Sequence, residues 1–160
     1  MDRQKAMNIL EKHIKSEPLK KHMIFSAYIM EEVATHLNQN HDKWYLAGLL
    51  HDIDIEQPDY NTSNHGLLAA DILQGEGFDD KEIIESIKFH NGENNGLGQR
   101  TDKFHHALSA CESVSGLVSA MAMILPDKNI NKVKVKSFFP PKTSKLKIYF
   151  KKSKEDTNGC

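Results

Sequence analysis

The stretch LAGLLHDIDIE, residues 46–56, places one histidine and two aspartates directly after an apolar run. Imidazole and carboxylate ligands together suit first-row divalent metal ions. Burying an unpaired carboxylate is unfavourable, and a bound cation would offset that penalty. The apolar run LAGLL would anchor a helix in the core and so hold His51 and Asp52 rigidly, as a metal site requires of its ligands. The stretch therefore indicates a metal site at the end of a buried helix.

Four further candidates fall on other predicted helices: His22, His65, His90 and Glu112. Neighbouring helical positions point about 100° apart. His51 and Asp52 can therefore share one site only near a helix end, or if the carboxylate bridges two ions with its two oxygens. Asp54 is a candidate orienting residue or proton acceptor in catalysis, and an exposed helix-terminal acid is the equally compatible alternative.

The remaining histidines are assigned to capping, interior hydrogen bonds or exposure. They are His13, His36, His41, His105 and His106. Lys88 and Arg100 could bind a phosphate group, although the favoured interpretation is that both are charged residues of the surface. The glycine-rich loop 91–100 could act as a lid, and a plain connection is the favoured alternative.

The elements that must position these residues are helical. Apolar residues recur at helical spacing, which predicts six helices: 2–15, 18–37, 41–52, 63–78, 79–91 and 101–125. Pro18 fits a helix start, Gly75 and Gly77 a helix end, and Asp79 with Glu82 a capping box. No strand pattern occurs before residue 130.

The charge divides the chain into an acidic body and a basic tail. Residues 1–130 hold 12 Lys and Arg against 20 Asp and Glu, whereas residues 131–160 hold 9 Lys against 2 acids. VKVKSFF and KLKIYF alternate with period two around Pro140 and Pro141, which allows a β-hairpin. A solvated, extended or disordered tail is the favoured interpretation. A nucleic-acid-binding arm is not expected, since the aromatic and Arg pattern is missing.

Length, cysteine content and missing motifs restrict the classes to which the protein can belong. A length of 160 residues favours one domain, 1–130, with the tail 131–160. Only two cysteines, no signal peptide and no apolar run of about 20 residues suggest a cytoplasmic protein with no membrane partner. The motifs GxGxxG, GxxxxGK[ST], CxxC and GxSxG are absent, which removes the main rival classes of enzyme.

The order of the candidates resembles a known family. His22, then LLHD with His51 and Asp52, then NHG, FHNG and an acid in LSACESVSGL resembles the HD-domain metal-dependent phosphohydrolase superfamily. The small stand-alone bacterial HDIG-type hydrolases are most similar, over roughly residues 5–135. The resemblance implies an all-α fold: a single compact HD-domain bundle of about six helices.

The resemblance also implies a site with one or two divalent ions of Fe, Mn, Co, Ni or Zn. His22, His51 and Asp52 match the primary ligands, and His65 and His90 match the additional histidines of two-metal members. Glu112 stands where the family usually has Asp. Asp52 would lie between two ions, with His22, His51 and Glu112 on one and His65 and His90 on the other.

The implied activity is hydrolysis of a phosphate ester or anhydride by a metal-activated water. The expected substrate is a nucleotide or another small phosphorylated metabolite; no GYP phrase follows the core, which argues against cyclic dinucleotides. The alternative is a catalytically impaired HD fold that binds a metal or ligand as a regulatory module, and Glu112 is the feature that favours it. The oligomeric state stays open, with a homodimer as one alternative.

Overall fold

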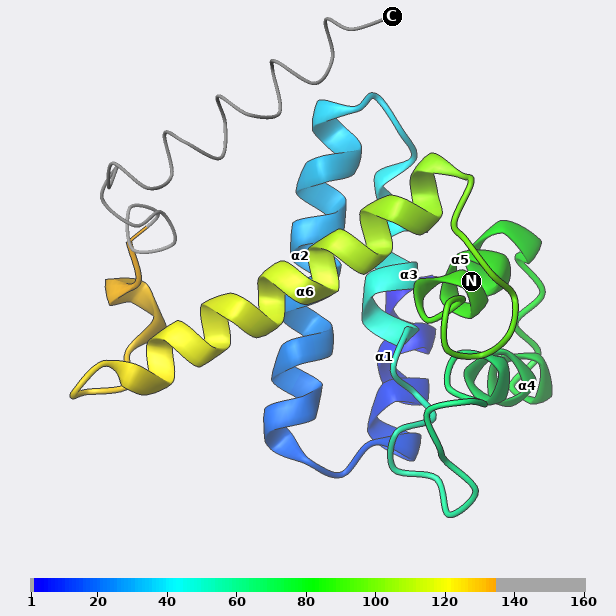
Figure 1. Ribbon diagram of the computed structural model, residues 1–160, viewed down its shortest axis with the longest axis horizontal. Coiled ribbons are helices and arrows are strands. Elements are labelled where there is room, and N and C mark those ends of the chain that lie inside the picture. Colours follow the sequence, from blue (N-terminus) through cyan, green and yellow to red (C-terminus); the bar gives the residue numbers. More distant parts are fainter. Residues whose placement is uncertain (1, 135–160) are drawn as a thin grey trace, which may run out of the picture. The chain divides into compact units, whose positions relative to one another are not determined.

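The computed structural model describes residues 2–134, which form helices and connecting loops (Figure 1). The α-helices are α1 (Arg3–His13), α2 (Glu17–His36), α3 (His41–Leu50), α4 (Leu67–Gly75), α5 (Lys81–His90) and α6 (Lys103–Ile124), and a 3₁₀ turn, η1, covers Ile130–Lys132. The described residues contain no strand. The predicted all-α class with about six helices is confirmed.

Two compact units make up the chain, Met1–Ala120 and Met121–Cys160. All the candidate site residues belong to the first unit. The division of the sequence at residue 130 stays a prediction. The predicted tail, 131–160, and the possible hairpin, which begins at residue 133, lie outside the described residues except for their first positions, up to residue 134.

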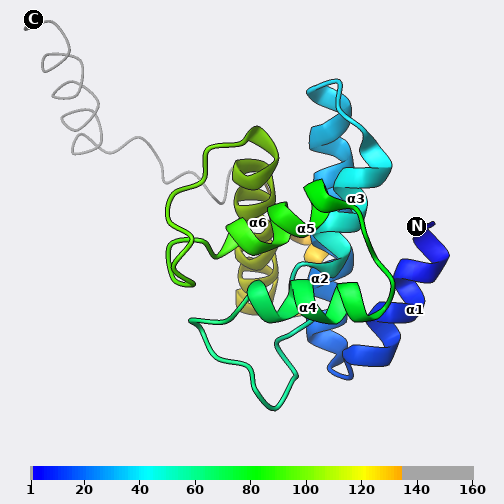
Figure 2. The same cartoon turned by 90° about the vertical axis from the view of Figure 1, so that its right-hand side faces the viewer.

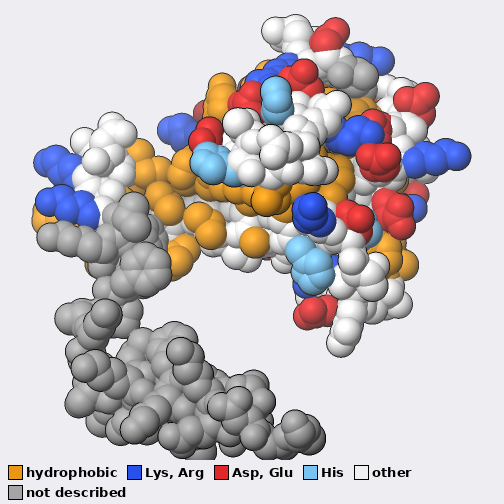
Figure 3. Space-filling model, turned by 90° about the horizontal axis from the view of Figure 1, so that it is seen from above, with side chains coloured by type: hydrophobic (Ala, Val, Ile, Leu, Met, Phe, Trp, Pro, Cys, Tyr) orange, Lys and Arg blue, Asp and Glu red, His pale blue; other side chains and the backbone are white. Residues whose placement is uncertain are grey.

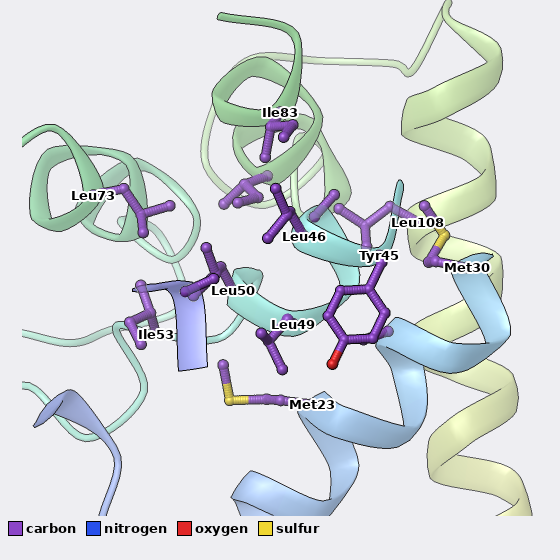
Figure 4. Close-up of a cluster of buried hydrophobic side chains, with 14 of the residues drawn as sticks. Met23, Met30, Tyr45, Leu46, Leu49, Leu50, Ile53, Leu73, Ile83 and Leu108 are labelled. Carbon is purple, nitrogen blue, oxygen red and sulfur yellow. The ribbon is translucent and has the colours of Figure 1, made fainter. Parts of the chain in front are cut away.

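Helix α3 lies at the centre of the first unit and contacts α1, α2 and α5, while α4 contacts α5 (Figure 2). Every residue from Trp44 to Leu50 is buried. A helix that is apolar all round must be enclosed by other helices. Figure 4 shows Leu46, Leu49 and Leu50 of α3 surrounded by side chains from α2, α4, α5 and α6. The core therefore fixes the C-terminal end of α3, where His51 and Asp52 follow.

Gly48 allows α3 to approach α2 closely. A Cβ atom at Gly48 would lie 2.8 Å from Ala27 Cα and 2.9 Å from Ala27 N. Real Cβ atoms do not come that near to backbone atoms, so only glycine fits between the two helices. This contact sets the distance between α2, which carries His22, and α3.

The helix starts differ from the sequence predictions at two points. Asp80, not Asp79, caps α5, since its side chain accepts hydrogen bonds from the N–H groups of Glu82 and Ile83. Helix α4 begins at Leu67 rather than near residue 63, because Gly66 has φ +84°. A residue at positive φ interrupts helical geometry, so His65 lies in the loop before α4.

Helix α6 is long and apolar enough, by length and composition, to cross a membrane, which the sequence analysis did not expect. One such helix is weak evidence, since core helices of globular proteins pass the same test. Phe104, Leu108, Cys111 and Ser115 of α6 are buried in the protein, whereas Val114 and Leu117 are about half exposed. The face in Figure 3 shows acidic and basic side chains interspersed beside a band of hydrophobic ones.

Candidate metal centre

His51 is the C-cap of α3 and is completely buried. Its Nδ1 donates a hydrogen bond to the carbonyl oxygen of Gly48 at 2.9 Å. Its Nε2 is also buried but has no hydrogen-bond partner. Buried polar atoms without partners are rare in folded proteins. A divalent cation would take the Nε2 lone pair, so this atom supports the predicted chemistry.

The Asp52 carboxylate lies among four imidazoles and uses one oxygen for each pair. Oδ2 lies 3.3 Å from His51 Nε2 and 3.6 Å from His22 Nε2. Oδ1 lies 3.3 Å from His65 Nε2 and 3.7 Å from His90 Nε2. This division of its two oxygens is the arrangement that a bridging carboxylate requires.

The six predicted metal ligands form two groups. One contains His22, His51 and Glu112, the other Asp52, His65 and His90, and in each group one ligand atom per residue lies within 4.8 Å of the others. The structure therefore brings all six side chains together from α2, the end of α3, the loop before α4, α5 and α6. Glu112, the departure from the usual Asp, reaches the first group. Their role as ligands stays a prediction.

The Nδ1 atom of each of the four imidazoles has a hydrogen-bond partner. His90 donates to the carbonyl of Ile87, as His51 does to Gly48. His65 Nδ1 lies 2.9 Å from the Asp54 carboxylate, and His22 Nδ1 lies 3.2 Å from Ser115 Oγ. Such bonds fix the tautomer of a metal-binding histidine and leave Nε2 free to coordinate. The ring orientations therefore suit cation binding through Nε2.

The second group also shows a close approach of two nitrogen atoms. His65 Nε2 and His90 Nε2 are only 2.9 Å apart. Since both rings donate through Nδ1, two Nε2 lone pairs would face each other in the neutral rings. A proton or a metal cation between them removes that repulsion. The donor set of imidazole nitrogen and carboxylate oxygen thus fits a divalent transition metal.

The electrostatics favour an ionised Asp52. Burial opposes its ionisation, but the positive charge of His51 and the nearby imidazole nitrogens of His51, His65 and His90 outweigh burial and hold the Asp52 pKa well below its ordinary value. The pKa of His65 rises to about 9, because hydrogen bonds to Asp52 and Asp54 overcome the effect of its burial. By contrast, burial and the nearby charge of His51 lower the pKa of His22. The centre therefore carries negative charge at Asp52, where a cation would bind.

Asp54 is fully buried, and both its oxygens accept hydrogen bonds. Besides the bond from His65, Oδ2 accepts from the backbone N–H groups of Gly66 at 2.9 Å and Ala69 at 3.2 Å. It thereby caps α4, whose own N-cap Gly66 has no side chain. Of the two functional roles predicted for Asp54, this geometry favours the orienting role over proton transfer.

The loop 91–100 is hydrogen-bonded to the backbone of two candidate ligands, His65 and His90. Asn95 Nδ2 donates to the carbonyl oxygens of His65 at 3.0 Å and Lys88 at 2.8 Å, and Arg100 donates to the carbonyl of His90. Arg100 also pairs with Glu93. The Nη1 and Nη2 atoms of Arg100 thus bind a carboxylate and a backbone group of the neighbouring segment, whereas its buried Nε has no hydrogen-bond partner among the described residues. These contacts tie the loop to two candidate ligands.

The five histidines assigned to other roles lie outside both groups. His13 pairs with Glu76, and His36 with Glu32. His105 stacks on Phe89 with ring centroids 4.7 Å apart, while His41 and His106 are exposed. Sequence reasoning missed Ser115, since a single serine in a helix rich in Ser and Ala carries no local signal.

The fold and the centre together define a class: a helical domain with a histidine and aspartate cluster that could hold divalent metal. The family model described as HD domain matches residues 19–132. The chain belongs to the HD domain family, as the sequence resemblance predicted, and this family generally comprises metal-dependent phosphohydrolases. The comparisons with curated proteins and with solved structures found no match.

Proposed function

We propose that this protein is a metal-dependent phosphohydrolase that cleaves a phosphate ester or anhydride of a nucleotide or another small phosphorylated metabolite. The observation that carries the proposal is the position of Asp52, whose two oxygens face two separate pairs of histidines. His22, His51 and Glu112 would hold one ion, His65 and His90 the other, and Asp52 both. Divalent cations bound there would supply Lewis acidity and a nucleophilic water at neutral pH.

The residues of this chain provide rigidity and access. His51 and His90 are almost wholly buried, and the carbonyls of their own helices fix their rings. The His22 and His65 side chains keep 20% and 12% of their surface exposed. A substrate would therefore approach on the side of His22 and His65. Tyr60, half-buried with its ring centroid 5.5 Å from that of His65, lies at this edge.

The test begins with metal analysis of the purified protein, followed by a phosphate-release screen with Mn²⁺, Co²⁺ or Ni²⁺. The screen covers nucleoside mono-, di- and triphosphates and simple phosphate esters. We expect release that is lost in His51→Ala and Asp52→Ala and retained in His106→Ala, an exposed histidine outside the site. Release that persists in Asp52→Ala would refute the proposal.

The alternative, a metal-binding regulatory module, rests on Glu112 in place of the usual Asp. It predicts bound metal without turnover of any substrate in the screen. A Glu112→Asp variant that gains phosphate release from an inactive parent would support this alternative, because the parent would then lack activity only through the altered ligand.

A further inference from the structure

Ser115 of α6 is completely buried and hydrogen-bonds to His22 at two points. Its Oγ lies 3.2 Å from His22 Nδ1 and 3.3 Å from the His22 carbonyl oxygen. A hydroxyl group can accept one hydrogen bond while it donates another. Ser115 therefore accepts the Nδ1 proton of His22 and donates its own proton to the carbonyl. These two bonds fix the imidazole relative to its own backbone.

The Nδ1 partner of His22 differs in kind from those of His51 and His90. His51 and His90 stand at the C-terminal ends of their helices, where each ring reaches the carbonyl three residues earlier. His22 lies within α2, which runs from Glu17 to His36. Among the described residues, the hydrogen-bond partner of His22 Nδ1 is Ser115 Oγ, which comes from α6 rather than from α2.

We propose that Ser115 is the positioning residue that fixes the tautomer and orientation of His22 for metal binding. This inference deepens the proposed function, and its metal-binding part rests on it. Ser115 holds the proton of the ring on Nδ1 and leaves the Nε2 lone pair directed at the centre that contains Asp52. It touches neither substrate nor ion and acts only through His22.

Ser115 also lies one turn from the acidic candidate ligand on its own helix. Glu112 and Ser115 stand three residues apart on α6, a spacing that places both on one face. Across the part of the chain that the structure describes, the two Ser115–His22 bonds are the only hydrogen bonds between α2 and α6. They therefore join α2 and α6 next to the candidate ligand His22.

The first test measures affinity for Co²⁺ alone by titration of the metal-free protein. Ser115→Ala is expected to weaken one of the two binding steps by about 10–100-fold, as loss of a partner of a metal-binding histidine generally does. Ser26→Ala is the matched control: Ser26 is a fully buried serine of α2 whose Oγ has no hydrogen-bond partner among the described residues. Equal affinity of the Ser115→Ala variant and the wild type would overturn the proposal.

The second test separates an effect through His22 from a general packing effect. In a His22→Ala background, Ser115→Ala is expected to leave the remaining Co²⁺ affinity unchanged. A further loss of similar size in that background would overturn the proposal, since Ser115 would then act without His22. Thermal unfolding of all variants verifies that each one is folded.

The third test does not need a metal. In the metal-free protein at pH 8, ¹⁵N chemical shifts of the histidine side chains should report the Nδ1–H tautomer for His22. Ser115→Ala should shift His22 towards the Nε2–H tautomer, and Ser26→Ala should not. A wild-type His22 in the Nε2–H form would overturn the positioning role. A chain that binds no Co²⁺ would instead refute the proposed function, and the tautomer would still decide the role of Ser115.

Discussion

Asp54 accepts a hydrogen bond from His65 Nδ1 at 2.9 Å while its other oxygen caps α4 through the N–H groups of Gly66 and Ala69. One buried side chain thus connects the orientation of a candidate ligand to the start of a helix. A carboxylate behind a metal-binding histidine fixes its tautomer and makes it a stronger ligand. Stability and metal affinity should therefore both depend on Asp54.

Replacing Asp54 separates these two contributions. Asp54→Ala removes all three hydrogen bonds in a fully buried position and should lower the free energy of unfolding by about 1.5–3 kcal/mol or more. Asp54→Asn keeps an oxygen for the cap but loses the charge opposite His65. It should retain more stability and still lose about 10–100-fold in Co²⁺ affinity. Urea unfolding and metal titration measure the two effects.

The control for Asp54 is Asp71→Asn, which changes an exposed carboxylate of α4. It should alter neither the free energy of unfolding nor the Co²⁺ affinity. If Asp54→Asn binds Co²⁺ as tightly as the wild type, Asp54 is only a helix cap.

The helices could be predicted from the sequence because their signals are local. Apolar spacing, Pro18 at the start of α2 and Gly75 at the end of α4 all act within a turn or two of the helix. The start of α4 was wrong because its cap is not local. The Asp54 carboxylate that caps it lies twelve residues before Gly66 in the sequence, and the positive φ of Gly66 cannot be inferred from residue spacing alone.

The candidate site followed from the order of its residues, and the structure brings these residues together. Residue types and spacing pointed to His51 and Asp52, and the family resemblance supplied the positions of the other ligands. Ser115 was not predictable, since its partner His22 lies 93 positions away. A single serine has many structural roles, and only the packing of α6 on α2 distinguishes this one.

The position of Asp52 between two pairs of histidines predicts a specific pattern of metal loss. Wild-type protein should bind two ions per chain. Asp52→Ala should lose both, because one carboxylate serves both sites, whereas His90→Ala should lose only one. Metal content after dialysis, measured by mass spectrometry, gives the stoichiometry. Two ions retained in Asp52→Ala would contradict the bridging role.

Substitutions at Glu112 measure how strongly metal affinity depends on the length of this candidate ligand. Its carboxylate reaches the group with His22 and His51 from a backbone position set by α6. Glu112→Asp shortens the side chain by one methylene and should weaken one Co²⁺ site by about 10-fold, within the range for disturbed ligand positioning. Glu112→Gln keeps the length, loses the charge and serves as the comparison. Tighter Co²⁺ binding by the Asp variant would show that Glu112 is a compromised ligand.

The close approach of α2 and α3 at Gly48 predicts that the metal affinity of the site depends on the packing of these two helices. Gly48→Ala places a Cβ atom 2.8 Å from Ala27 Cα, a backbone atom that cannot move aside by rotation. Such overpacking should destabilise the protein by about 1–3 kcal/mol and displace α3, which is followed by its C-cap His51, from α2, which carries His22. Co²⁺ affinity should fall together with the free energy of unfolding.

Gly116→Ala is the matched control, since a Cβ atom on this helical glycine would meet nothing within 4 Å. It should stabilise the protein by roughly 0.5–1 kcal/mol, because alanine has the higher helix propensity. Urea unfolding of both variants, with Co²⁺ titration in parallel, distinguishes a local clash from a general effect of Gly→Ala substitution. If Gly48→Ala were as stable as the wild type, the spacing of α2 and α3 would not depend on Gly48, and the distance between His22 and His51 would have to be set by other contacts.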